Sequence, residues 1–257
     1  MRNLLYSMRM FGRRFPLAVA AIGLFGPAAC LGSAPNTELR VLVENSAEMP
    51  FAQMAHGHVV GGIQYDLSHL LAERLKRKLK IYLTPRKRIG DKLEAGDADM
   101  ACALIPQWLA ADVNWSRAFL PHAGVVVTLA SARRPDTLQD LAGERIGTIL
   151  GYRYGELESA LGDSFVREDA PNASAVLRKL DRGRTIHAAV NLQYLEYQRK
   201  LNLQRMDLHP YLYTGKYPTS CALSKKSRIP VREVDAAIEA IQKDGSLQLM
   251  LNKYRPD

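Results

Sequence analysis

Short apolar runs typical of β-strands alternate with helical patterns along most of this 257-residue chain. The first run covers residues 39–43. The pattern over residues 65–78 places leucines at helical spacing, with Asp66 in the first turn, where a carboxylate complements the helix dipole. Such alternation is typical of an α/β protein with largely parallel sheets. A composition of 47% hydrophobic and 24% charged residues is that of a globular protein, so we expect a buried core.

The second half of the chain repeats the pattern of the first. Leu-Glu-Ala-Gly at residues 93–96 precedes one apolar strand, and Leu-Asp-Arg-Gly at residues 180–183 precedes another. Two further apolar runs, over residues 124–130 and 219–223, are expected to pair as crossovers between two similar lobes. We expect lobe 1 to comprise residues 38–126 and 219–257, and lobe 2 to comprise residues 127–218.

Residues 1–34 have the three parts of a secretory signal. Arginines precede an apolar run over residues 15–25, and small residues follow it as far as Ala34. The run of about 11 residues is shorter than the roughly 20 that a bilayer-spanning helix needs. Cleavage near Ala34 and lipidation at Cys30 are alternatives. We therefore expect residues 1–34 to be a signal peptide and the mature protein to be exported to the periplasm.

The positive charge of the chain does not indicate nucleic-acid binding. The 35 basic and 26 acidic side chains give a formal charge of +9, but four of the arginines lie in the leader. The remaining excess is modest, and the densest basic stretch, residues 74–88, is split between a predicted helix, a strand and a loop. We expect a small-molecule ligand, no nucleic-acid partner and a monomer.

Six short phrases occur in a fixed order over nearly the whole mature chain. They are Met49-Pro-Phe51, Gly61-Gly-Ile-Gln-Tyr-Asp-Leu67, Leu93-Glu-Ala-Gly-Asp-Ala-Asp-Met100, Asn114-Trp-Ser116, Leu138-Gln-Asp-Leu-Ala-Gly-Glu-Arg-Ile-Gly147 and Lys243-Asp-Gly-Ser-Leu247. Their order resembles the bacterial extracytoplasmic solute-binding proteins of the amino-acid-binding type, family 3. The resemblance implies a two-lobed type II periplasmic-binding-protein-like fold, with two doubly wound mixed sheets joined by two crossover strands and a ligand between the lobes.

In such a fold the ligand lies outside the carboxyl ends of the parallel strands, so the loops that follow the strands hold the candidate residues. The candidates for ligand binding are Asn45, Phe51, Arg88, Leu104, Trp108, Gly151, Tyr152, Tyr154 and Asn191.

Three of these positions have a structural as well as a functional interpretation. Phe51 resembles the family's cleft aromatic, or it is a core residue that anchors a turn. Arg88 matches an arginine suited to bidentate capture of a carboxylate, although Arg86 replaces the tryptophan of that pattern; alternatively, Arg88 is a solvated arginine at a helix start. Residues 151–154 enter a helix and offer backbone N–H groups to an anion, or their two tyrosines stack or pack the helix onto the sheet.

Two departures from the family pattern concern the charged partners of an amino-acid ligand. Trp108 or Leu109 stands where the family has an arginine that clamps the ligand carboxylate. The acidic residue that holds an α-amino group aligns near Leu192, with only Asn191 close by. A buried zwitterion without its counter-charges is costly, so a less charged, aromatic or singly anionic ligand fits better.

The mature chain has two cysteines, Cys102 and Cys221. In the resembled fold the strand of Cys221 runs antiparallel beside that of Cys102, which implies a cross-strand disulfide near the hinge. Two buried free thiols are the alternative.

No motif in the sequence indicates a reaction, a metal or a cofactor. His56 and His58 lie in a turn-like segment without a cysteine or carboxylate cluster, and no nucleophile elbow or phosphate loop is present. The leading hypothesis is a periplasmic protein, not an enzyme, that delivers a small organic solute to an ABC-type permease. The alternatives are an enzyme like the periplasmic cyclohexadienyl dehydratases, with Glu44, Glu48 and Glu156 as the nearest acid/base candidates, or a ligand-sensing accessory subunit.

Overall fold

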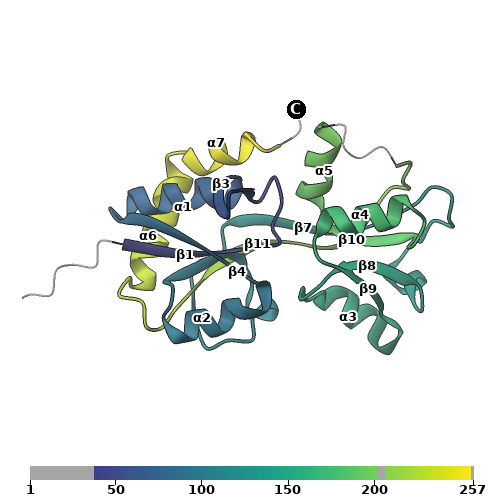
Figure 1. Cartoon of the computed structure of the whole chain (residues 1–257), viewed down its shortest axis with the longest axis horizontal. Coiled ribbons are helices and arrows are strands. Elements are labelled where there is room, and N and C mark those ends of the chain that lie inside the picture. Colours follow the sequence, from purple (N-terminus) through teal and green to yellow (C-terminus); the bar gives the residue numbers. More distant parts are fainter. Residues whose placement is uncertain (1–37, 202–205, 256–257) are drawn as a thin grey trace, which may run out of the picture. The chain divides into compact units, whose positions relative to one another are not determined.

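The structure, a computed structural model, describes residues 38–201 and 206–255 (Figure 1). The signal peptide expected over residues 1–34, including Cys30, lies outside the described residues. The strands are β1 (Glu38–Glu44), β2 (Gln53–Ala55), β3 (His58–Gly61), β4 (Lys78–Thr84), β5 (Met100–Leu104), β6 (Asn114–Trp115), β7 (Leu120–Thr128), β8 (Arg145–Ile149), β9 (Val166–Ala170), β10 (His187–Asn191) and β11 (Leu212–Leu223). The α-helices are α1 (Ile63–Arg74), α2 (Ile89–Ala95), α3 (Gly155–Leu161), α4 (Ala173–Asp181), α5 (Leu192–Lys200), α6 (Val231–Lys243) and α7 (Ser246–Asn252).

The main sheet is mixed and runs in the order β4-β1-β5-β11-β7-β10-β8-β9, with β6 beside β11. At one end β1 is parallel to β4 and β5, and at the other β8 is parallel to β9 and β10. The long strand β11 joins the two parts because its halves have different partners. Its first half is antiparallel to β7, through pairs up to Thr219 with Leu120, and its last residues are antiparallel to β5.

Helices cover the strands on both faces, as the alternation of buried side chains along β1 requires. Leu39, Val41 and Val43 face one way and pack with α1, α6 and α7, whereas Leu42 faces the other way and packs with α2. Helix α6 shows why the sequence forms this layer: Val234, Ala237, Ile238 and Ile241 recur every three or four residues and are buried, and Pro230 precedes the first turn.

The chain from β7 to β11 builds a second pair of layers. Helices α4 and α5 pack against Val125, Val127 and Val190, and α3 packs on the opposite face with Val126 and Ala189. Each of the four core clusters takes its buried side chains almost entirely from one of the two expected lobes. We therefore propose the lobe boundaries expected from the sequence. The one refinement is that Val125 and Val126 pack with lobe 2.

Two elements differ from the sequence prediction for identifiable reasons. β11 begins at Leu212, whereas the apolar run predicted only residues 219–223, because the side chains of its first half are partly or largely exposed and many are polar. Helix α5 was not predicted; its buried face consists of Leu192, Tyr194 and Leu195, and polar residues surround them.

Glycine is required where the β2–β3 hairpin passes into α1. Gly62 has φ of +98°, and a Cβ atom there would lie 2.6 Å from the Cα atom of Ala52. Any other residue would therefore displace the loop that follows β1, which carries Phe51.

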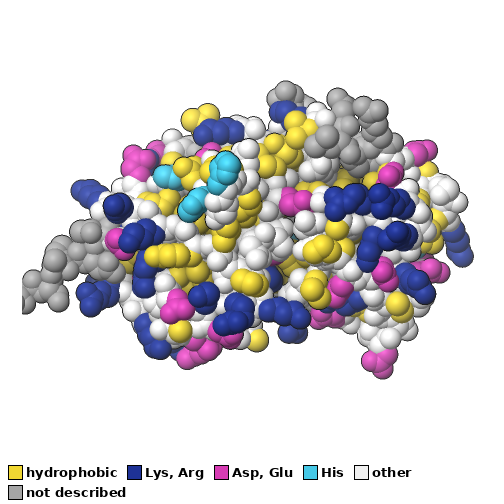
Figure 2. All heavy atoms as spheres, in the orientation of Figure 1, with side chains coloured by type: hydrophobic (Ala, Val, Ile, Leu, Met, Phe, Trp, Pro, Cys, Tyr) yellow, Lys and Arg dark blue, Asp and Glu magenta, His cyan; other side chains and the backbone are white. Residues whose placement is uncertain are grey.

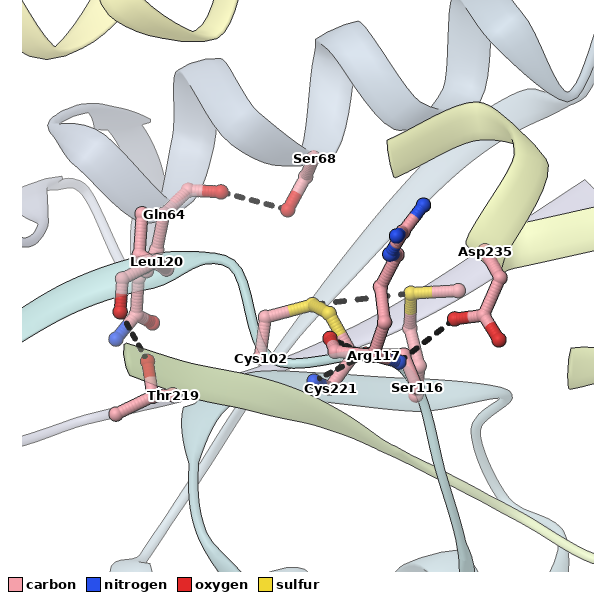
Figure 3. Close-up of a disulfide and its surroundings, with 10 residues drawn as sticks. Gln64, Ser68, Cys102, Ser116, Arg117, Leu120, Thr219, Cys221 and Asp235 are labelled. Carbon is pink, nitrogen blue, oxygen red and sulfur yellow. Dashed lines mark hydrogen bonds between the residues drawn. A yellow bond between two sulfur atoms is a disulfide. The ribbon is translucent and has the colours of Figure 1, made fainter. Parts of the chain in front are cut away.

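A disulfide joins Cys102 of β5 to Cys221 of β11, with Cα atoms 3.8 Å apart (Figure 3). Cys221 is buried, and its backbone N–H donates to the Ser116 hydroxyl at 2.9 Å. Arg117, the residue after Ser116, donates its backbone N–H to Asp235 of α6 at 2.7 Å. The disulfide therefore sits within lobe 1, in a network that ties the end of β11 to β6 and α6.

The surface in the view of Figure 2 carries basic side chains over α4, with carboxylates beside them. Lys179 of α4, for example, pairs with Glu168 of β9 at 2.8 Å. Within residues 38–201 and 206–255, the helices are all too short or too polar to traverse a lipid bilayer.

Candidate functional site

A cavity of about 140 Å³, measured as the space open to the centres of water molecules, is lined by residues of both lobes. A single water molecule needs roughly 10–15 Å³ on this measure, so the cavity has room for a small organic solute. Its aromatic lining consists of Phe51, Trp108, Tyr152, Tyr154, Tyr194 and Tyr217, and its titratable charged or basic lining consists of Glu44, Glu48, Arg86, His122, Arg153 and Glu156.

An open groove of about 870 Å³ adjoins this cavity. Trp108, Glu156 and Tyr217 line both spaces. These three side chains therefore form the partition between the cavity and the groove.

The structure brings five of the nine predicted ligand residues to the cavity. Asn191 is the last residue of β10 and the other four follow strands, as the topology rule for parallel sheets requires. They are Phe51, Trp108, Tyr152, Tyr154 and Asn191.

The other four predicted residues do not line the cavity. The Asn45 side chain is exposed, and Leu104 packs in the core beneath α2. Gly151 adopts a φ of +84° in the turn after β8. Arg88 is 65% exposed and lies 3.6 Å from Asp91, which is the solvated helix-start arrangement.

Arg86 occupies the position that the sequence analysis assigned to Arg88. Pro85 precedes a short 3₁₀-helix over Arg86–Arg88, in which a shift of two residues turns a side chain about 240° around the axis. The Arg86 side chain is 12% exposed, and its guanidinium lies 4.9 Å from the Tyr152 ring centroid and 5.9 Å from that of Trp108. Arg86 of lobe 1 is thus stacked against a lobe 2 ring.

Glu44, at the end of β1, neutralises Arg86. The Arg86 Nη1 atom lies 3.4 Å from Glu44 Oε2, and the Glu44 side chain is 5% exposed. The Ser46 hydroxyl donates to the other carboxylate oxygen, and the Tyr152 hydroxyl also donates to Glu44. Burial, followed by the negative charge of Glu44, raises the pKa of Tyr152 well above its usual value, so this hydroxyl stays protonated.

Glu48 connects lobe 1 to the start of α4 in lobe 2. Its carboxylate accepts the backbone N–H of Ser174 at 2.8 Å, in the first turn of α4. Asn172 caps the same helix by accepting the N–H of Ala175 at 3.0 Å. The positive end of α4 is therefore occupied by two side chains of the protein itself.

Two of the four backbone N–H groups expected to receive an anion at residues 151–154 donate within the chain. The N–H of Tyr152 donates to the Ile149 carbonyl at 3.1 Å, and the N–H of Tyr154 donates to the Glu158 carboxylate at 3.2 Å. These two N–H groups are therefore not available to an anion, and the rings of Tyr152 and Tyr154 form part of the cavity wall.

Three rings cluster where β7 and β11 pass the cavity. Trp108 lies 4.8 Å from His122 and 5.9 Å from Tyr217, and His122 stacks on Tyr217 at 5.3 Å between centroids. Burial, assisted by the nearby charge of Arg86, lowers the pKa of His122 to about 4. His122 is therefore neutral at neutral pH, and its Nδ1 atom accepts a hydrogen bond from the Asn191 amide at 2.9 Å.

Glu156 of α3 completes this corner of the cavity. Its carboxylate and Tyr217 are neighbours in the cavity wall, and burial followed by the interaction with Glu156 raises the pKa of Tyr217. Within the described part of the chain, no ion pair joins Glu156 to a lysine or arginine.

Four residues of the cavity lining are not indicated by the sequence: Arg86, His122, Tyr194 and Tyr217. Tyr194 follows the predicted strand at residues 186–190 by four positions, but no helix was predicted there. His122 and Tyr217 lie within long strands, where nothing in the local pattern distinguishes a cavity wall from an ordinary sheet face. Among residues 38–201 and 206–255, no three His, Cys, Asp or Glu side chains gather as a metal site would require.

Comparisons with known proteins identify the architecture. The sequence profile of the bacterial extracellular solute-binding proteins, family 3, matches residues 39–257. A comparison with curated protein sequences finds no significant match.

Among solved structures, an ancestral arginine-binding protein bound to arginine is 20% identical, with a TM-score of 0.71 over 85% of this chain and 98% of that one. A substrate-binding protein of an ABC uptake transporter from Streptococcus pneumoniae, with bound histidine, is 17% identical, with a TM-score of 0.71 over 85% of this chain and 92% of that one. An ancestral amino acid-binding protein described as a precursor of cyclohexadienyl dehydratase is 17% identical, with a TM-score of 0.69 over 85% and 96%. These likenesses confirm the expected type II periplasmic-binding fold.

Proposed function

The chain belongs to family 3 of the bacterial extracellular solute-binding proteins, and from this premise we propose that it captures a small organic solute between its two lobes. The observation that carries the proposal is the cavity lined by residues of both lobes, with side chains of one lobe contacting the other across it. Glu48 reaches Ser174, and Arg86 stacks on Tyr152. Contacts of this kind close two lobes around a ligand when the connecting strands bend.

Delivery to an inner-membrane ABC-type permease is the second part of the proposal. The family membership supports it, as do the structural neighbours described as substrate-binding proteins of amino acid ABC transporters. We place the mature, monomeric protein in the periplasm on the same grounds, and we expect either cleavage near Ala34 or lipidation at Cys30 to release or anchor it.

A thermal-shift screen of the mature protein tests solute capture. A ligand that binds only the folded state stabilises it by RT ln(1 + [L]/Kd), so a solute at about 100 times its Kd adds about 2.7 kcal/mol. The panel should contain amino acids, amines, small carboxylates and short peptides, followed by calorimetric titration of each hit.

The expected result is stabilisation by at least one solute, with binding lost in Tyr152→Ala and kept in Leu249→Ala. Leu249 is 69% exposed on α7 and provides a control far from the cavity lining. Absence of any stabilising solute, or binding that Tyr152→Ala leaves unchanged, would contradict capture in this cavity.

Enzymatic conversion of the bound solute is the second candidate. Glu44, Glu48 and Glu156, the acid/base candidates of the sequence analysis, all line the cavity, and one structural neighbour is a precursor of a dehydratase. Glu44 and Glu48 are engaged in contacts that hold the site together, so Glu156 is the carboxyl group free to act. His122 is already neutral at neutral pH, so it does not supply a proton as an imidazolium.

Mass analysis of each hit after incubation separates these candidates. Recovery of the unchanged solute supports capture, and a product that disappears in Glu156→Gln supports an enzyme. Uptake of the labelled hit by cells with and without the gene then tests delivery. Lost uptake supports the permease partner, whereas binding without any change in uptake supports a ligand-sensing accessory subunit.

A further inference from the structure

The one buried cation of the cavity is already neutralised. Arg86 lies against Glu44, and the two side chains are 12% and 5% exposed. A ligand carboxylate placed on Arg86 would approach the Glu44 carboxylate, and two carboxylates at short range in a poorly hydrated site repel each other strongly. The Arg86–Glu44 pair therefore contributes little net attraction for an anionic group.

Several of the backbone positions suited to an anion are filled as well. Glu48 accepts the Ser174 N–H at the start of α4, and Glu158 accepts the Tyr154 N–H before α3. The remaining cation of the lining, Arg153, is 58% exposed and lies 4.0 Å from Glu158. To bind at any of these groups, a ligand carboxylate would have to compete with one of the protein's own carboxylates.

Glu156 is the carboxylate that this arrangement leaves without a cation. The polar group that interacts with its carboxylate is the hydroxyl of Tyr217, which is neutral. Around it stand the rings of Trp108 and Tyr217, whose centroids are 5.9 Å apart and which come from lobe 1 and lobe 2 respectively. Aromatic faces beside a carboxylate attract an organic cation, through the ring quadrupole and through ion pairing.

We propose that the solute is an organic amine that lacks a carboxylate, with its ammonium group on Glu156 beside Trp108 and Tyr217 and its apolar part in the aromatic cavity. This inference rests on the proposed function and adds the class of solute. Because Trp108 and Tyr217 belong to different lobes, an ammonium group in contact with both rings would also hold the lobes together. Glu156 lies on the partition between the cavity and the outer groove, so the amine meets it on entry.

Matched pairs of solutes test the proposal, each pair consisting of an amino acid and the amine left after its carboxylate is removed. Suitable pairs are arginine with agmatine, tyrosine with tyramine, and histidine with histamine. Calorimetric titration gives the affinities. Fluorescence of Trp115→Phe gives a second readout, because the chain has two tryptophans and that variant leaves only Trp108 in the cavity wall. We expect the amine of at least one pair to bind tenfold or more tightly than its amino acid.

The variant Glu156→Gln should weaken binding of that amine by roughly 10- to 100-fold, which corresponds to one charge-assisted hydrogen bond. Glu239→Gln is the matched control. Glu239 lies on α6, is 68% exposed and pairs with Arg117, so removal of its charge should leave the affinity unchanged. Equal melting temperatures of the ligand-free variants establish that both fold.

The possible outcomes distinguish failure of the amine proposal from failure of the proposal that the cavity captures a solute. Tighter binding of the amino acid in every pair that binds, or amine binding that Glu156→Gln leaves intact, would overturn the amine proposal and leave capture in place. Binding of only neutral or anionic solutes from the wider panel would do the same. If no solute of the panel binds, capture in this cavity is overturned and the amine proposal with it.

Discussion

The carboxylate of Glu48, in the loop after β1, accepts the backbone N–H of Ser174 at 2.8 Å, although 126 positions separate the two residues in the sequence. Glu48 belongs to lobe 1 and Ser174 to lobe 2, so this hydrogen bond exists only while the lobes are together. It also lies at the positive end of α4, where a carboxylate is favoured.

Glu48→Ala should therefore favour separation of the lobes. Glu48 is partly exposed, so we expect a loss of about 1 kcal/mol from the closed form, which changes the ratio of closed to open molecules about fivefold. Distances between spin labels, one on each lobe, measure that ratio. Glu48→Gln keeps an acceptor oxygen and should have a smaller effect. Identical distance distributions in Glu48→Ala and the unaltered protein would show that this contact does not hold the lobes.

Arg86 and Arg88 form a natural pair for comparison, since they differ by two positions and by their surroundings. Arg86→Ala leaves the Glu44 carboxylate buried without its counter-charge and should lower the free energy of unfolding by about 3 kcal/mol. Arg88→Ala should change it by less than about 0.5 kcal/mol, because Arg88 is largely exposed.

Denaturant titration of the two single variants and of Glu44→Gln/Arg86→Met measures these effects. The double variant removes both charges and should recover most of the loss. Equal stability of Arg86→Ala and Arg88→Ala would contradict the buried ion pair.

The Cys102–Cys221 disulfide closes a loop of 119 residues that contains all of lobe 2. Restriction of so long a loop in the unfolded chain predicts that Cys102→Ala/Cys221→Ala loses about 5 kcal/mol of unfolding free energy. Thermal unfolding with and without reductant measures the same effect in the unaltered protein. A count of two free thiols in the denatured, unreduced mature protein would rule the disulfide out.

His122 should make stability depend on pH below neutrality. Its pKa is about 4 in the folded protein and about 6.5 when unfolded, so between these values the unfolded chain binds a proton that the folded protein does not. The contribution of neutral His122 to the free energy of unfolding is therefore fully present above pH 6.5. It decreases as the pH is lowered from 6.5 toward 4, and it is lost below pH 4. The loss amounts to about 3 kcal/mol.

His122→Asn, which keeps a hydrogen-bond acceptor for Asn191, should remove this part of the pH dependence. The measurement is the difference in unfolding free energy between the two proteins at pH 7 and pH 4. Parallel curves for the two proteins would mean that His122 does not titrate in this range.

Residues in the loops that follow predicted strands could be placed at the site from the sequence alone. Phe51, Trp108, Tyr152, Tyr154 and Asn191 were found this way, because the carboxyl ends of parallel strands meet at one edge. The two-lobed fold followed from the repeated alternation and from the order of the family phrases.

The charged groups of the site could not be placed with the same accuracy. The choice between Arg86 and Arg88 depends on the direction of each residue in one 3₁₀ turn, and the partner of Glu48 depends on how lobe 2 approaches lobe 1. Neither is encoded in local periodicity. The neutralisation of Arg86 depends on Glu44, which lies 42 positions away in the sequence. Only the folded chain shows that these two side chains are paired.

β11 is hydrogen-bonded to β7 over one half and to β5 over the other, with an irregularity in register between Ser220 and Ala222. A strand fixed at both ends to different neighbours can bend and twist but cannot slide. The lobes of this molecule should therefore rotate relative to each other by bending and twisting of β11, without translation of one lobe along the strand. The lobes would return to the same mutual orientation each time they meet.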